Sequence, residues 1–320
     1  MQIIIMHNYH KYFNVTDTYQ ELRIPNNALY IYGISPEDRS NGYIDLQETG
    51  EILFCKINKI EGDDLIEVGN ERKEVHLRNL DGISALIENF KRDNIYIDVT
   101  GLDNRICAPL IKQCISIFTE GKIKSIRVIY SEPLEYDVKK FKVEGVFSDL
   151  SEKIQGINPL PGFIKVFPRD NEDVYLIPLL GFEGGRFIHL LEEVECTDKN
   201  VIPVIGLPGF RVEYPQIAFW GNQKPLKDTG SWRNIKYASA NSAIEVYFLL
   251  KKLLRDKPDA YFKIAPIGTK PHAIGAMIFA ARFEEQTELV YDNPIRKIKK
   301  TKGVGKVVEC LVSELLTAEE

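Results

Sequence analysis

The sequence predicts an α/β protein built from two Rossmann-like lobes with mainly parallel sheets. The first observation behind this prediction is that two stretches, 94–133 and 261–294, each read as strand, tight turn, helix and strand. The second is that both stretches close on the pattern Tyr-x-x-Pro, at 130–133 and 291–294. Two units of this kind indicate two related halves.

The third observation lies upstream of each unit. There an apolar run ends in a glycine-bearing loop in which an acidic residue precedes an arginine, with Glu37 and Arg39 in one loop and Glu183 and Arg186 in the other. Because the order of parts repeats, we predict a first lobe over 1–150 and a second over 151–320. The boundary falls in the glycine- and proline-rich stretch 141–162.

Composition agrees with two folded domains. The chain has 320 residues, 44% of them hydrophobic and 27% charged. No apolar stretch approaches the roughly 20 residues that a membrane helix needs, and the N-terminus turns polar too soon for a signal peptide. We therefore expect a cytoplasmic protein. Five widely spaced cysteines indicate neither a disulfide framework nor a metal site, and the net charge of −5 argues against general binding of duplex DNA.

The first lobe begins with an expected strand at 2–6 and a loop that holds His7 and His10, which would bind a metal or a base or form only a polar loop. A strand follows at 29–32. The region 42–73 predicts strands or an irregular hairpin, and a short helix is expected at 83–90.

The turn after the 94–98 strand carries Asp98, Thr100, Gly101 and Asp103. Carboxylates beside a phosphate site would repel the anion, so these two would require Mg²⁺, a ribose hydroxyl or an arginine as partner. The alternative is that Asp103 or its neighbour Asn104 caps the following helix.

The second lobe begins with a strand at 174–180 and a helix that ends at Glu193. Between them, the backbone amides after Gly184 and Gly185 are candidates for phosphate binding, with Arg186 as a forked donor. These glycines equally suit close packing of the helix on the strand. The glycine spacing does not match a classical NAD-binding fingerprint.

A strand at 201–205 runs into a glycine-bearing loop that ends at Arg211. From there to residue 237 lie about 25 residues without clear periodicity, which contain Trp220 and Trp232. Loops of this length in compact domains are usually functional or disordered. Tryptophan faces suit stacking on a nucleobase, although tryptophan also seals loops onto a core.

An apolar helix at 239–254 leads to the central turn, Gly268-Thr269-Lys270-Pro271. Glycine permits a sharp turn and close approach to a ligand, and proline suits the first turn of a helix. The turn would direct amides, a hydroxyl and an ammonium at a phosphate, or would be only a well-made strand-to-helix connection. A basic run over 295–306 would strengthen the anion site if it folds back beside Lys270, or else forms a solvated tail before a last helix at 306–316.

The strand, Gly268-Thr269-Lys270 turn and helix resemble the carboxyl-side motif of CRISPR-associated Rossmann fold domains, which bind cyclic oligoadenylates. The resemblance implies that these three residues hold phosphates. The Thr100-Gly101 turn resembles a weaker version of the same motif. No ribonuclease motif, restriction-type cluster or winged-helix tail characteristic of that family's effectors is evident.

Three functions follow. The leading hypothesis is a nucleotide or oligonucleotide sensor of a bacterial defence or regulatory system, in which Gly268, Thr269, Lys270, Arg186 and Arg39 hold phosphate. A tryptophan would stack on a base. The second is a nucleotide-processing enzyme whose acid–base groups would come from one set of candidates: Asp98, Glu132, Glu183 and His272. The third is a non-catalytic adaptor that docks a partner protein or a second copy of the chain.

Overall fold

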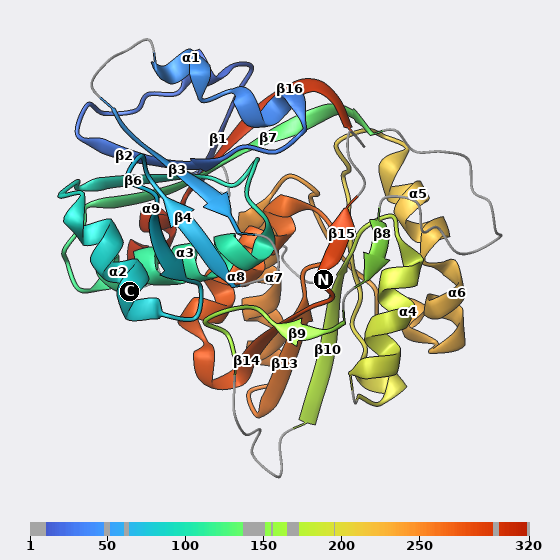
Figure 1. The fold of residues 1–320 in the computed structure, drawn as a ribbon. Coiled ribbons are helices and arrows are strands. Elements are labelled where there is room, and N and C mark those ends of the chain that lie inside the picture. Colours follow the sequence, from blue (N-terminus) through green and yellow to red (C-terminus); the bar gives the residue numbers. More distant parts are fainter. Residues whose placement is uncertain are drawn as a thin grey trace.

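The computed structural model describes residues 11–47, 52–60, 64–136, 151–154, 156–164, 173–194, 196–296 and 301–318. Two sheets lie on either side of a central layer of helices (Figure 1). This arrangement confirms the predicted α/β fold with two largely parallel sheets. Within those ranges, no helix has the length and apolar character that crossing a bilayer requires.

The described part of the first sheet has eight strands. In order across the sheet they are β1 (Phe13–Thr16), β16 (Thr301–Leu311), β7 (Ser125–Tyr136), β6 (Asn94–Asp98), β2 (Ala28–Gly33), β3 (Leu53–Lys59), β4 (Leu65–Val68) and β5 (Lys73–His76). The central strands β7, β6, β2 and β3 are parallel, and the flanking strands are antiparallel. The region 42–73 therefore contains the β3–β4 hairpin.

The second sheet has the strand order of a Rossmann fold. Its strands are β12 (Lys236–Ala238), β11 (Val204–Gly206), β10 (Asp173–Leu180), β13 (Ala260–Ala265), β14 (Thr287–Tyr291) and β9 (Asn158–Pro159). The first five are parallel and follow the order 3-2-1-4-5 along the chain. A separate short ribbon pairs β8 (Ser151–Ile154) with β15 (Pro294–Arg296).

The helices form three groups. Between the sheets lie α2 (Leu80–Asn89), α3 (Asn104–Thr119), α7 (Ala243–Asp256), α8 (Lys270–Arg282) and α9 (Val312–Thr317). The outer face of the second sheet carries α4 (Gly184–Glu193), α5 (Tyr214–Gly221) and α6 (Gln223–Asp228). The outer face of the first sheet carries α1 (Ile44–Gln47) and the 3-10 helix η2 (Tyr19–Glu21). Further 3-10 helices are η3 (Asp38–Asn41), η4 (Asp198–Asn200), η5 (Ser231–Asn234) and η6 (Glu284–Gln286).

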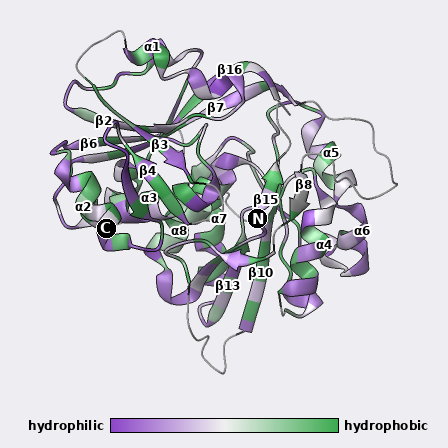
Figure 2. Ribbon diagram, in the orientation of Figure 1, coloured by the Kyte–Doolittle hydropathy of each residue, from purple (hydrophilic) through white to green (hydrophobic). Residues whose placement is uncertain are grey.

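Strand alternation assigns each side chain to one of these layers. In β10, Ile177 and Leu179 face the central helices, whereas Leu176 and Leu180 face α4. The central cluster is continuous from one sheet to the other, so the two lobes share a core. Helix α8 lies inside this cluster with every residue from Pro271 to Ala280 buried, whereas the peripheral α6 is mostly hydrophilic (Figure 2).

The end of the chain returns to the first lobe. Strand β16, red in Figure 1, pairs with β7 and with β1, and α9 packs against β7. The predicted second lobe, 151–320, was therefore wrong at its C-terminal end. The predicted last helix at 306–316 starts only at Val312, and the basic run contributes to β15 and β16 rather than to a free loop. Residues 297–300 of that run lie outside the described ranges.

Two further predictions concern the start of the chain and the aperiodic region before residue 237. The opening strand at 2–6 and the loop with His7 and His10 lie outside the described residues. The aperiodic region before residue 237 contains α5, α6 and η5. These helices are four to eight residues long, which is too short for a helical period to be visible in the sequence.

The return of β16 generates a prediction about truncation. A chain that ends at residue 296 lacks the strand between β7 and β1 and the buried apolar side chains of α9, so we expect its first lobe not to fold. Near-ultraviolet circular dichroism and size-exclusion chromatography measure the effect, with a chain ending at residue 318 as control. A cooperative unfolding transition equal to the control's would contradict the topology.

Candidate functional site

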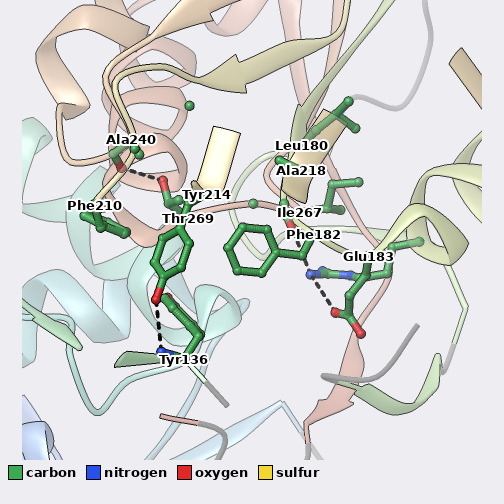
Figure 3. Close-up of a pocket in the computed structure, with 15 residues that line it drawn as sticks. Tyr136, Leu180, Phe182, Glu183, Phe210, Tyr214, Ala218, Ala240, Ile267 and Thr269 are labelled. Carbon is green, nitrogen blue, oxygen red and sulfur yellow. Dashed lines mark hydrogen bonds and ion pairs between the residues drawn. The ribbon is translucent and has the colours of Figure 1, made fainter. Parts of the chain in front are cut away.

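A pocket lies at the switch point of the second sheet, where neighbouring strands β10 and β13 send their connections to opposite faces. After β10 the chain passes to α4 on the outer face, and after β13 it passes to α8 in the central layer. Open α/β sheets leave a crevice at such a point, beyond the carboxyl ends of the strands. The loops that follow β10, β11 and β13 line the pocket (Figure 3).

Aromatic side chains form one wall of this switch-point pocket. Tyr136, Phe182 and Tyr214 contact one another edge to face, with ring centroids 5.3 to 5.7 Å apart. Phe210 lines the pocket beside them. Tyr136 comes from the end of β7, and its backbone N–H donates to the Tyr214 hydroxyl at 3.2 Å. The wall therefore joins the first sheet to the loops of the second.

Among the described residues that line the pocket, only Glu183 and Arg186 carry charge. The Arg186 guanidinium donates to both oxygens of the buried Asp292 carboxylate, at 2.7 and 2.6 Å, and to the carbonyl of Ile267 at 2.7 Å. Glu183 accepts from the Ser151 hydroxyl at 2.9 Å, and its carboxylate lies 4.0 Å from Arg186. The two charged lining side chains therefore balance, and Asp292, which pairs with Arg186 but does not line the pocket, adds one further negative charge.

The enclosed part of the pocket has a volume of about 70 Å³ and opens to solvent. A dry cavity of roughly 150 Å³ holds one benzene ring. An aromatic ring would therefore need a lining side chain to rotate, and Phe182 and Phe210 are half-buried. Gly181 and Gly268 bring the two loops into backbone contact at its base, since a Cβ on Gly268 would lie 2.6 Å from the Leu180 carbonyl oxygen.

The predicted phosphate turn serves the fold. The Thr269 hydroxyl accepts from the His272 amide at 3.4 Å, which caps α8, and it donates to the Ala240 carbonyl at 2.8 Å. The Lys270 ammonium points to the first lobe, where it donates to the Val99 carbonyl at 2.5 Å. Gly268 and Thr269 line the pocket, but Lys270 does not. The prediction that all three residues converge on one phosphate was therefore wrong.

Arg39 is likewise committed to the protein. It is buried, pairs with Glu37 at 2.8 Å, and donates to the Tyr130 hydroxyl and the Ser131 carbonyl, both at 2.8 Å. The Arg39 contacts resemble those of Arg186, since each arginine also lies over the tyrosine of its lobe's Tyr-x-x-Pro pattern. Both predicted phosphate arginines thus clamp the last parallel strand of their own lobe.

The first lobe has a closed switch point. A Cβ on Gly101 would lie 1.9 Å from the Gly33 carbonyl oxygen, and the Thr100 hydroxyl accepts from the Ser131 amide at 3.0 Å. The buried Asp98 carboxylate accepts from the hydroxyls of Tyr19 and Tyr30, at 3.0 and 2.8 Å. Burial raises the pKa of Asp98, while these hydrogen bonds lower it. Protein groups therefore occupy the positions predicted for a ligand or Mg²⁺.

The other acidic candidates are also accounted for. Asp103 caps α3 by accepting from the Ile106 amide at 3.0 Å, as one of the two predictions held. Glu132 is buried beside Asn241, and burial raises the pKa of its carboxyl group. Neither residue lines the pocket. Within the described residues, no three His, Cys, Asp or Glu side chains are grouped as a metal site would require.

His272 and the two tryptophans do not line the pocket. His272 is fully buried on α8, with Nε2 3.0 Å from the Ser239 carbonyl, and burial lowers its pKa to about 4. Trp220 and Trp232 are about half exposed, and the Arg233 guanidinium lies 4.5 Å from the Trp232 ring centre. The predicted stacking of these tryptophans on a ligand beside Lys270 therefore has no geometric basis.

Sequence reasoning missed the aromatic wall. Phe182 and Phe210 stand in glycine-bearing loops that were already assigned to strand ends, and Tyr214 follows closely. Loops after the two strands beside a switch point line the crevice, so strand order would have selected these residues. Tyr136 had no such signal, because it arrives from the other lobe.

Comparisons with known proteins give no assignment. No family model matches the chain, and no curated protein matches it. Among solved structures, an ABC transporter solute-binding protein from Burkholderia multivorans has 14% identity, covers 81% of this chain and 75% of its own, and has a TM-score of 0.25. The precorrin-6A reductase CobK has 9% identity, coverage of 84% and 89%, and a TM-score of 0.21.

An N-terminal ketoreductase from a macrolactin assembly line has 12% identity, coverage of 86% and 71%, and a TM-score of 0.22. TM-scores this low support no argument about this chain. The site must therefore be interpreted from its own geometry.

The Arg186–Asp292 pair generates a prediction about stability. Asp292→Ala leaves a buried guanidinium without its carboxylate, which costs about 3–5 kcal/mol in the free energy of unfolding. Denaturant unfolding measures this cost, and Asp259→Ala, at an exposed position, is the matched control. The double variant Arg186→Met/Asp292→Leu should recover most of the loss, because apolar replacement of a buried pair is often neutral. If Asp292→Ala and Asp259→Ala lowered the free energy of unfolding equally, the Arg186–Asp292 pair would not stabilise the fold as described.

Burial of His272 generates a prediction about pH. The folded state binds this proton more weakly than the unfolded state, since the pKa falls from 6.5 to about 4. The resulting stability is present above pH 6.5 and is lost as pH falls toward 4, by up to about 3 kcal/mol. His272→Gln should remove this part of the pH dependence in denaturant titrations, whereas His76→Gln, at an exposed site, should not. Identical pH profiles for wild type and His272→Gln would disprove it.

Proposed function

We propose that this protein is a binding protein for a small neutral or cationic organic molecule with a planar ring, of the nucleoside class, held at the switch-point pocket. The aromatic wall carries the proposal, since three mutually contacting rings from two sheets meet where an α/β fold binds ligands. A ring that packs against the aromatic wall, at Phe182 or at Phe210, would bury a face there. Ribose hydroxyl or amine donors would bond to the Glu183 carboxylate.

Charge favours the nucleoside over the nucleotide. Arg186 is already paired with Asp292, Glu183 adds a carboxylate to the lining, and the Lys270 ammonium is directed at the first lobe. A phosphate placed in the pocket would lie near the Glu183 carboxylate, and like charges repel strongly between low-dielectric walls. The proposal therefore keeps ligand sensing, as the resemblance to CRISPR-associated Rossmann fold domains implied, but replaces phosphate anchoring with ring recognition.

The enzymatic alternative depends on one residue. Of the four predicted acid–base residues, Glu183 alone lines the pocket, so a reaction at this site would use its carboxylate as the proton acceptor. Incubation of the ligand panel with the protein, followed by chromatography, separates binding from turnover. A product that disappears with Glu183→Gln would favour the enzyme.

The binding proposal predicts a charge preference. A nucleoside at about a hundred times its dissociation constant should stabilise the protein by about 2.7 kcal/mol. At the same concentration, its 5′-phosphate and cyclic oligoadenylates should stabilise it by less. Glu183→Gln exchanges a charged acceptor for a neutral one, so nucleoside affinity should fall about tenfold, with Glu193→Gln on the exposed face of α4 as control. Thermal shift and calorimetry measure both effects. Tighter binding of the phosphorylated ligands would refute the proposal.

A further inference from the structure

A second concave surface lies on the outside of α7, away from the switch-point pocket. This α7 groove has a volume of about 590 Å³. Its apolar floor comes from three elements: Tyr237 of β12, Phe248, Leu249 and Leu254 of α7, and Phe283 after α8. Because β12 is the outermost strand of the second sheet, the groove lies at the edge of the molecule.

The groove is preformed by the packing of α7. Val246, Tyr247 and Leu250 are buried against the core, so Phe248 and Leu249 project from the opposite side of the helix and are half-buried. The Phe248 ring contacts the rings of Tyr247 and Tyr12, at centroid distances of 5.4 and 6.3 Å. An apolar floor with fixed side chains loses little entropy when a partner docks.

Basic residues border this floor. Lys252 and Arg255 follow Phe248 on the same helix face, four and seven residues along, and both are exposed. Lys251 lines the groove as well. Arg255 lies 3.9 Å from its exposed neighbour Asp256, which is a weak contact in water.

The carboxylate that lines the groove is hydrogen-bonded within the protein. Among the described lining residues, Glu245 is the one carboxylate, and its oxygens accept from the Ser239 amide at 2.7 Å and the Ser239 hydroxyl at 2.5 Å. The groove is therefore a positive site on a chain whose net charge is −5. Charge of this kind selects acidic partners and speeds their association.

We propose that the α7 groove docks an acidic amphipathic segment of a partner protein. Apolar side chains of the segment would fill the floor between Phe248 and Phe283, and its carboxylates would pair with Lys252 and Arg255. A nucleic acid backbone would satisfy the cations but leave the apolar floor exposed. A second copy of this net negative chain would have to present an acidic apolar ridge.

The groove and the switch-point pocket are also close to each other in the sequence. Tyr237 in the groove and Ala240 in the switch-point pocket are three residues apart, in the connection from β12 to α7. The two surfaces thus share one short connection, although the docking proposal does not require a ligand. Its test uses the protein alone.

Fluorescence anisotropy with synthetic peptides tests the proposal. The first probe is a labelled amphipathic peptide with leucines at i, i+3, i+4 and i+7 and glutamates elsewhere, and the second has lysines in place of the glutamates. We expect the glutamate peptide to bind and the lysine peptide not to bind. Raising the salt concentration should weaken the interaction, because exposed charges contribute to it.

Variants assign the binding to the groove. Lys252→Glu/Arg255→Glu should weaken the glutamate peptide by about tenfold or more and shift the preference toward the lysine peptide. Lys73→Glu/Lys302→Glu makes the same change in net charge at exposed positions of the first lobe and should have no effect. Tyr237→Ser removes an exposed ring, 55% accessible, and should weaken binding without lowering the melting temperature.

Three results would overturn the docking proposal. They are absence of glutamate-peptide binding at about millimolar protein, equal binding by the charge-reversed variant, and equal binding of the two peptides. A sedimentation shift that Tyr237→Ser abolishes would assign the groove to a second copy instead. Loss of single-stranded oligonucleotide binding in the charge-reversed variant, without peptide binding, would assign it to nucleic acid.

Discussion

The structure depends on burying α8 between two sheets. A helix packed on all sides must be mostly apolar all round. The sequence from Pro271 to Ala280 meets this requirement apart from His272, whose ring hydrogen-bonds to the Ser239 carbonyl. Small residues allow close approach, and Gly275 lies against the Ala243 carbonyl of α7. One continuous core follows, and with it a fixed relation between the lobes. That relation decides where Lys270, at the first position of α8, directs its ammonium.

The repeated pattern in the sequence has a structural origin. In each lobe two glycines let the loops after neighbouring parallel strands touch, Gly33 with Gly101 and Gly181 with Gly268. In each lobe an arginine from the first of these loops then clamps the last parallel strand. The acidic residue, the arginine and the Tyr-x-x-Pro pattern recur because each lobe uses an arginine to fix the end of its last parallel strand. The repeat therefore reports architecture rather than two ligand sites.

The lobes differ where function is proposed. The first switch point is filled by Asp98 and its tyrosine partners, and the second stays open because Phe182, Phe210 and Tyr214 surround a space instead of filling it. A buried carboxylate with several protein donors gives stability and specificity to its own lobe. An aromatic wall beside one carboxylate suits ligand binding. The α7 groove is lined by Tyr237 and the switch-point pocket by Ala240, so the proposed ligand site and the proposed docking surface border the same β12–α7 connection.

The sequence by itself determined most of the local elements, because hydrophobic period and turn chemistry are local properties. These are the parallel strands other than β12, the helices from α2 to α4 and from α7 to α8, and the glycine turns between them. It also placed cations correctly at strand ends. Only the tertiary structure decided which acceptor each cation meets, since the Val99 carbonyl that binds Lys270 is 171 residues away in the chain. The same holds for β16, whose partners β1 and β7 come from the first lobe, and for Tyr136 in the pocket. Contacts between distant segments depend on how sheets and helices stack. The hydrophobic period of a single segment does not predict that stacking.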